Sequence, residues 1–181
     1  MKDLSLYILD LVQNSLRAEA KSISVLVKDS VSKNQLEIVI KDDGHGMDPE
    51  FLAKVTSPFV STRTTREVGL GIPFFQMAAE LTGGTLQIDS TLGHGTTLRG
   101  IFVRSHIDTP PLGDMTETVV TLVQGAPDVD FLCCYETDLQ MLTFDTREIR
   151  EILEDVPLNT PDVLGWIRDH LNELKLSIEN N

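Results

Sequence analysis

Three polar side chains near the N-terminus could together hold a metal ion and a phosphate group. Asp10, Asn14 and Arg17 are spaced at i, i+4 and i+7, which places them on one side of a helix. Carboxylate and amide oxygens bind hard cations such as Mg²⁺, and a guanidinium group pairs with phosphate. The alternative is that they are the solvent-facing side of an ordinary surface helix. The motifs further along the chain favour the first interpretation.

The segment from residue 4 to residue 18 is the element that would carry these side chains. Its apolar residues recur at helical spacing and gather on the side away from the polar stripe: Leu4, Ile8, Leu11, Val12 and Leu16. Two segments of alternating apolar residues, 23–27 and 36–40, come next. The sequence therefore predicts an amphipathic helix followed by two β-strands.

The second predicted strand runs directly into Asp42, Gly44 and Gly46. Glycine is needed where the backbone adopts unusual dihedral angles or lies against a ligand with no Cβ in between. A carboxylate at the end of the strand could accept a hydrogen bond from the exocyclic amine of adenine, the donor that distinguishes adenine from guanine. The alternative is an Asp-Gly turn before a helix that Asp48 caps and Pro49 begins. Such a cap does not require the two glycines.

A short hydroxyl-rich and basic segment, residues 57–66, follows in a chain that is otherwise acidic. Gly69-Leu70-Gly71 and a helical pattern over 72–81 come directly after it. Unpaired amides at the start of a helix favour an anion, as do Arg63 and Arg66, so this segment could close over phosphates. A Gly-x-Gly before a helix is, on its own, equally typical of an ordinary loop.

Two more strands complete this part of the chain. Paired glycines at 83 and 84 end the helix, residues 85–90 read as a strand, and a Gly-His-Gly-Thr-Thr turn at 93–97 leads into a last strand ending near Val103. The predicted order is helix, two strands, short helix, basic loop, helix and two strands.

This order of elements and motifs resembles the ATP-binding domain of the GHKL superfamily, named after gyrase, the heat-shock chaperone, histidine kinases and MutL. The resemblance covers about residues 4–104. It implies an α+β fold, a two-layer α/β sandwich in which helices cover one face of a mixed sheet, with ATP and Mg²⁺ as ligands. The run from Gly69 to Thr97 and the short basic loop are most similar to histidine kinases of signal transduction.

The resemblance also implies roles for individual residues. Asn14 is similar to the magnesium-chelating asparagine of the family, and Arg17 to the basic residue that approaches phosphate. Asp42 takes the place of the adenine-reading aspartate, and Thr96 that of the hydroxyl that joins the adenine network. The remaining implied nucleotide-binding residues belong to the two glycine motifs, the ATP lid between them and the end of the first helix: Ala18, Gly44, Gly46, Met47, Thr62, Arg63, Thr64, Arg66, Gly69, Leu70, Gly71 and Ile72.

Two positions depart from the family pattern. Glu67-Val68 precedes Gly69-Leu70-Gly71, so the first glycine of the Gly-x-Gly-Leu-Gly form is absent. Asp10 stands one turn before Asn14, where the ATPase branches and the anti-sigma kinases usually carry Glu. A carboxylate there could orient water, take a proton from a hydroxyl acceptor or support magnesium, which makes Asp10 the candidate catalytic residue. The alternative is an exposed helix acid.

The chain offers no clear phosphoacceptor of its own. The first predicted helix begins so close to Met1 that we expect no upstream helix pair with an acceptor histidine, and His170 lacks the proline expected soon after such a histidine. We therefore expect the acceptor to be another protein. Two other functions stay open: a MutL-like switch that hydrolyses ATP, and a module of the anti-sigma type that binds ATP without catalysis.

Composition narrows the class of partner and the compartment. The chain has 181 residues and a formal net charge of -13, which argues against nucleic acid and acidic membrane surfaces as partners. No run of about 18 apolar residues suits a membrane span, and Asp3 and Asp10 are unsuited to a secretory signal, so we expect a cytoplasmic protein. Cys133 and Cys134 are adjacent in an apolar segment, which favours a buried strand over a redox pair or metal site.

A proline-containing segment over 109–114 predicts a linker between two domains. The first, 1–108, is the ATP-binding domain. The second, 114–181, is predicted to be a small α+β domain of unknown role. Its predicted strands are 118–123, 131–135 and 139–144. Helices are expected from the capping box at 145–148 and from Thr160, and the apolar face of the second helix serves either as core or as a partner surface.

Overall fold

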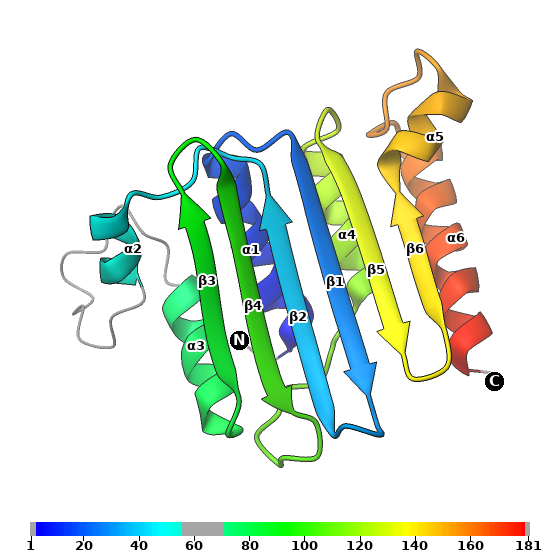
Figure 1. The fold of residues 1–181 in the computed structure, drawn as a ribbon. Helices are drawn as coiled ribbons and strands as arrows, with labels where there is room; N and C mark the ends of the chain where they lie inside the picture. The colour runs from blue at the N-terminus through cyan, green and yellow to red at the C-terminus, as the bar shows by residue number, and fades with distance from the viewer. Residues whose placement is uncertain (1–2, 56–70, 180–181) are drawn as a thin grey trace.

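A computed structural model describes residues 3–55 and 71–179 and shows one six-stranded sheet in the order β3-β4-β2-β1-β5-β6 (Figure 1). Every neighbouring pair is antiparallel except β1 and β5, which are parallel. The mixed sheet confirms the predicted α+β class. The strands are β1 (Ser22–Ser30), β2 (Gln35–Asp42), β3 (Thr85–Thr91), β4 (Gly95–Val103), β5 (Asp130–Thr137) and β6 (Met141–Asp145).

Helices cover one face of this sheet and leave the other open, which makes a two-layer structure (Figure 1). The covering helices are α1 (Leu4–Arg17), α3 (Gly71–Leu81), α4 (Met115–Gly125) and α6 (Pro161–Glu179). Two short helices complete the structure: α2 (Pro49–Val55) lies beside the β3 edge of the sheet, and α5 (Thr146–Leu153) lies beyond the end of β6 (Figure 1). Among the described residues, no helix combines the length and the apolar character needed to cross a membrane.

The alternating and helical patterns of the sequence form the predicted elements in the first half of the chain. In α1 the carboxylate of Asp3 accepts a hydrogen bond from the backbone N–H of Leu6 and caps the helix, whose apolar side is buried. From Ile23 to Val27 in β1, and along β2, every second residue is buried. Asp48 caps α2 by accepting from the N–H of Phe51, 2.8 Å away, as its position before Pro49 predicts.

The segment predicted as a strand over 118–123 is instead part of the helix α4. Its β-branched residues favour a strand locally, but the carboxylate of Asp114 accepts a hydrogen bond from the N–H of Glu117 and caps a helix there. The buried side chains Thr116, Val119 and Val123 also follow helical spacing. The strand prediction was wrong because this burial against the sheet outweighs local preference.

Residues on both sides of the predicted linker belong to the same sheet. β5 pairs with β1 along its length, from Ser22 opposite Asp130 to Asp29 opposite Thr137. The linker itself is attached to the start of α1, since the N–H of Leu4 donates to the carbonyl of Pro111 at 2.9 Å. The predicted strands 131–135 and 139–144 correspond to β5 and β6. The division into two domains stays a prediction, while the hydrogen bonding of the sheet is continuous across it.

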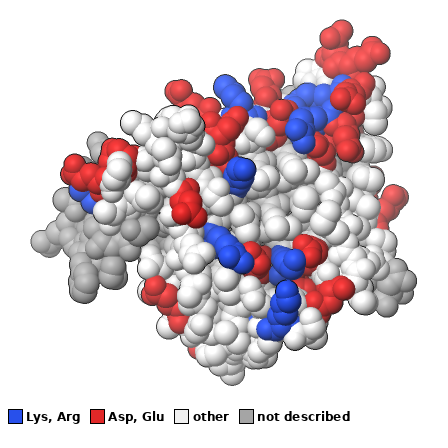
Figure 2. All heavy atoms as spheres, in the orientation of Figure 1, with Lys and Arg blue, Asp and Glu red and all other residues white. Residues whose placement is uncertain are grey.

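The open face of the sheet carries cross-strand ion pairs. Lys28 pairs with Glu136 at 2.5 Å, and Arg99 pairs with Glu37 at 2.6 Å. In Figure 2, which views this face, acidic and basic side chains lie beside one another with uncharged surface between them. Because these pairs are partly exposed, each contributes little to stability, but together they keep the face polar.

The centre of the core is an aromatic cluster under β4, and its loss should be costly. Phe75 is fully buried between Tyr7 and Phe102, with ring centroids 5.7 and 5.3 Å away. We expect Phe75→Ala to lower the free energy of unfolding by about 3–5 kcal/mol, measured by urea denaturation. The matched control is Phe74→Ala, at a side chain that is 41% exposed, which should cost about 1 kcal/mol or less. Equal losses would contradict this account of the core.

Candidate functional site

A pocket of about 250 Å³ opens on the helix-covered side of the sheet, between α1, α2, the start of α3 and the strands β2 and β4. Residues from distant parts of the sequence meet there. Several of the residues singled out from the sequence line it: Asn14, Arg17, Ala18, Asp42, Gly46, Met47, Ile72 and Thr96. The structure thus brings the polar end of α1 and the first glycine motif to one cavity.

The carboxylate of Asp42 is the most constrained polar group in the pocket. It is only 8% exposed and is held on both oxygens: Ser15 Oγ donates to Oδ2 at 2.6 Å, and the N–H of Gly44 donates to Oδ1 at 2.9 Å. Burying a carboxylate is unfavourable unless it is hydrogen-bonded, so these two donors stabilise it. A carboxylate can accept about four hydrogen bonds, which leaves Asp42 able to accept more from a ligand.

Asn14 carries a buried polar atom without a partner. Its Oδ1 accepts a hydrogen bond from Arg17 at 2.9 Å, whereas its Nδ2 has none, and among the described residues it is the one buried side-chain nitrogen or oxygen in that state. Such an orphan costs about 1–3 kcal/mol, and a missing ion or ligand is a common explanation. When Arg17 turns away, rotation of the amide can exchange the two atoms and present an oxygen at the same place. Asn14 therefore fits a ligand or a metal ion.

A second hydrogen-bond network surrounds Thr96, which lies opposite Asp42 in the pairing of β2 with β4. Its hydroxyl is 2.8 Å from Ser90 Oγ. The Ser90 hydroxyl also accepts a hydrogen bond from the N–H of Met47 at 2.9 Å and donates one to the carbonyl of Gly95 at 3.1 Å. This serine ties the turn after β2 to the β3–β4 hairpin and fixes the wall of the pocket that Met47 and Thr96 share.

Two glycines allow backbone to approach where a side chain would not fit. Gly46 has a positive φ of +67°, and a Cβ there would lie 2.1 Å from the carbonyl oxygen of Thr91. Gly71, at the start of α3, packs against α1, because a Cβ on it would lie 2.3 Å from Asp10 Oδ2. Asp10 is half-buried at that contact and does not line the pocket directly. It faces the second glycine motif instead.

Part of the predicted site lies outside the described residues. The implied lid and phosphate-side residues in this group are Thr62, Arg63, Thr64, Arg66, Gly69 and Leu70. Their roles therefore stay predictions.

Sequence reasoning missed two serines and the apolar walls of the pocket. Ser15 and Ser90 form the hydrogen bonds that position Asp42 and Thr96, but a single serine carries no spacing signal. The apolar residues that line the pocket together with Asp42 suit the faces of a flat ring. They are Leu11, Ile40, Phe51, Val55, Ile72 and Leu98. Periodicity identified several of these as core and gave no indication that they border a cavity.

Comparison with known protein families shows to which family the chain belongs. Residues 2–107 match the family described as histidine kinase-, DNA gyrase B- and HSP90-like ATPase. The chain belongs to this family. The assignment agrees with the geometry of the pocket, because the matched region contains all of its lining residues. The resemblance to the GHKL superfamily is confirmed.

The curated relatives within this family include sensor histidine kinases. A protein of Shewanella frigidimarina named for a sensor role is 36% identical over 103 residues, and histidine protein kinase DivJ of Caulobacter vibrioides is 35% identical over 95 residues. These matches cover 56% and 50% of the chain, but only 16% of either relative. The chain is thus a GHKL ATPase-domain protein related to sensor histidine kinases, and it spans about a sixth of the length of these two relatives.

Among solved structures, the N-terminal domain of a DNA repair protein has a similar fold, with a TM-score of 0.51 and 16% sequence identity. The match covers 80% of this chain and 53% of the other. The matched 80% of this chain is longer than the part up to residue 107. The likeness in fold therefore extends beyond the family match.

The hydrogen bond from Ser15 to Asp42 should matter for both stability and the pocket. We expect Ser15→Ala to lower the free energy of unfolding by about 1–3 kcal/mol, because it removes a donor to a buried carboxylate. Ser24→Ala, at a half-buried serine on β1, is the control and should change stability by about 0.5 kcal/mol or less. Denaturant titration of both variants measures the difference, and indistinguishable midpoints would refute the importance of this bond.

Proposed function

We propose that the chain binds ATP with Mg²⁺ in the pocket at Asp42 and transfers the γ-phosphate to a partner protein. The observation that carries the proposal is the buried, doubly hydrogen-bonded carboxylate of Asp42 between apolar walls. A pocket with one fixed acceptor between apolar surfaces suits a planar base with one donor group.

The carboxylate of Asp42 would favour binding of adenine over guanine for a chemical reason. Adenine presents an exocyclic amine, which can donate a hydrogen bond to the remaining lone pairs of the carboxylate. Guanine presents a carbonyl oxygen at the corresponding position, and two acceptors facing each other in a buried site repel and leave both unsatisfied. Ser15 and Gly44 hold the carboxylate in place, so it does not need to reorganise on binding.

Asn14 and Arg17 would hold the metal and the phosphates. When the exposed guanidinium of Arg17 leaves the amide oxygen of Asn14 and turns toward phosphate, that oxygen can serve as a ligand to Mg²⁺. Mg²⁺ bound with the nucleotide supplies charge neutralisation for phosphoryl transfer. In a chain of net charge -13, such local positive charge is needed to offset the general repulsion of a triphosphate. The predicted lid residues Arg63 and Arg66 would add to it.

Asp10 is our candidate for the group that assists the attacking nucleophile. Its carboxylate lies against Gly71 at the start of α3, on the side of α1 that also carries Asn14. A carboxylate in that position can accept a proton from an acceptor side chain or orient a water molecule. The relation to sensor histidine kinases favours transfer to a protein. The second candidate function is ATP hydrolysis that switches the conformation of the protein. The same carboxylate favours this function if water is the nucleophile.

Replacing Asp42 tests the adenine assignment. Asp42→Asn keeps the shape and can still bond to Ser15 and Gly44, but it presents an amide donor in place of an acceptor. We expect the affinity for Mg-ATP in titration calorimetry to fall roughly 10- to 100-fold. Wild type should bind GTP more weakly by a similar factor. The control is Asp43→Asn, at the exposed neighbouring residue, which should leave ATP affinity within about threefold. Unchanged affinity in the Asp42 variant would refute the assignment.

Incubation with γ-labelled ATP tests the reaction. With cell extract present, transfer predicts label on another protein, hydrolysis predicts free phosphate alone, and a passive ATP-binding module predicts neither. Asp10→Asn should reduce transfer or hydrolysis by about 100-fold or more while ATP affinity stays within about threefold. Asp89→Asn, at an exposed acid on β3, serves as the control and should react normally. Full activity in the Asp10 variant would show that this carboxylate has no part in the chemistry.

A further inference from the structure

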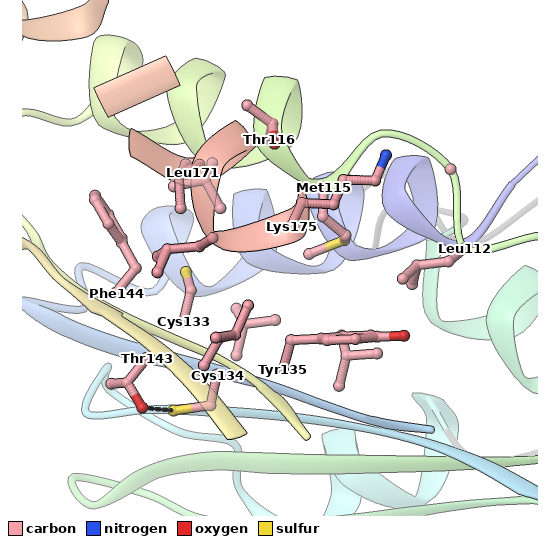
Figure 3. Close-up of a pocket in the computed structure, with 16 residues that line it drawn as sticks. Leu112, Met115, Thr116, Cys133, Cys134, Tyr135, Thr143, Phe144, Leu171 and Lys175 are labelled. Atoms are coloured by element: carbon pink, nitrogen blue, oxygen red, sulfur yellow. Dashed lines mark hydrogen bonds between the residues drawn. The ribbon is translucent and has the colours of Figure 1, made fainter. Parts of the chain in front are cut away.

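A second pocket, of about 180 Å³, lies between the sheet and the helices α4 and α6 (Figure 3). Its floor is the sheet, with side chains from β1, β5 and β6, and its roof is formed by α4, α6 and the segment at Leu112 and Gly113. It shares no lining residue with the pocket at Asp42. The residues that enter the argument are Leu112, Cys133, Tyr135, Phe144, Leu171 and Lys175.

The lining of this pocket is apolar at one end and polar at the other. In Figure 3, Phe144 and Leu171 lie at one end, while the Tyr135 hydroxyl and the Lys175 ammonium group lie toward the opposite end, near Leu112. The middle of the floor is formed by aliphatic residues of β1 and by Cys133. A cavity with this gradient suits a molecule that is itself apolar at one end and polar at the other.

The charge of the lining indicates which polar group such a molecule would carry. Lys175 is the only charged residue in the lining, although Asp and Glu outnumber Lys and Arg by 28 to 15 in the chain. Lys175 forms no ion pair with the side chains described for residues 3–55 and 71–177. Burial raises the pKa of the Cys133 thiol to about 12, so this wall stays neutral at physiological pH. The lining of the pocket therefore carries one positive charge, at its polar end, and no negative charge.

We propose that this second pocket binds a small aliphatic carboxylate, with its chain against Phe144 and Leu171 and its carboxylate at Lys175. An apolar cavity of about 150 Å³ is large enough to take up benzene, so the present volume suits a chain of about six to eight carbon atoms. Burial of the methylene groups supplies the affinity, and a charge-assisted hydrogen bond to the ammonium group orients the ligand. This site does not depend on nucleotide binding at Asp42.

Three probes of equal chain length separate the parts of the proposal. Octanoate, octanol and octylamine are titrated into the full chain by calorimetry, in the absence of nucleotide. We expect one octanoate to bind with saturation below about 1 mM. Octanol should bind roughly fivefold to tenfold more weakly, because it lacks the charge, and octylamine more weakly still. Equal affinity for octanoate and octanol would overturn the carboxylate class, and no saturable binding by any probe would overturn the site.

Two variants locate the binding. Lys175→Gln should lower octanoate affinity roughly fivefold and leave octanol unchanged, while Lys33→Gln, at an exposed turn residue, should change neither. Cys133→Leu adds volume to the floor and should weaken both probes at least about tenfold. Its melting temperature shows whether it is folded. Retention of octanoate affinity in both Lys175→Gln and a folded Cys133→Leu would place binding elsewhere and refute the proposal. Failure of ATP binding would leave these results unaffected.

Discussion

The hydrogen-bonded burial of the Asp42 carboxylate is the constraint on which the rest of the site depends. A negative charge at 8% exposure is tolerated only because Ser15, on α1, and the Gly44 amide, in the turn after β2, both donate to it. The first of these bonds, together with the buried apolar side of α1, fixes the rotation of the helix about its axis. With that rotation set, Asn14 points to the pocket and Asp10 meets the second glycine motif. The buried carboxylate of Asp42 thus holds together the helix, the strand and the turn that form the site.

The two pockets occupy opposite halves of the same helix-covered face and differ in chemistry. The first combines apolar walls with a fixed acid and an unpartnered amide, which suits a base and a metal-bound phosphate chain. The second combines apolar walls with a single lysine. In a chain of such negative net charge, both arrangements attract anions only through local groups. Between the pockets, α1 packs against α4, and the segment before α4 is hydrogen-bonded to the start of α1.

Much of the fold could be predicted from the sequence because its periodicity is strong. The helix at 4–17 and the strands of the first half follow from apolar spacing, and the glycine motifs identify the family. The helix α4 could not be recognised, since Val119 and Val120 suit a strand locally and only packing on the sheet makes them helical. The two serines of the site, Ser15 and Ser90, were not predicted as site residues for a different reason. A hydroxyl contributes through one hydrogen bond whose partner is distant in sequence, as Ser15 is from Asp42.

The parallel pairing of β5 with β1 has a practical consequence for anyone who dissects this protein. Residues 2–107, the part that matches the family, end before β5. Without β5, the backbone donors and acceptors on one side of Ser22–Ser30 would become unpaired, and the apolar surface of Val25 and Val27 would lose the cover of α4. An uncovered strand edge beside apolar surface is a template for association between copies. A fragment cut at the family boundary would therefore be prone to self-association.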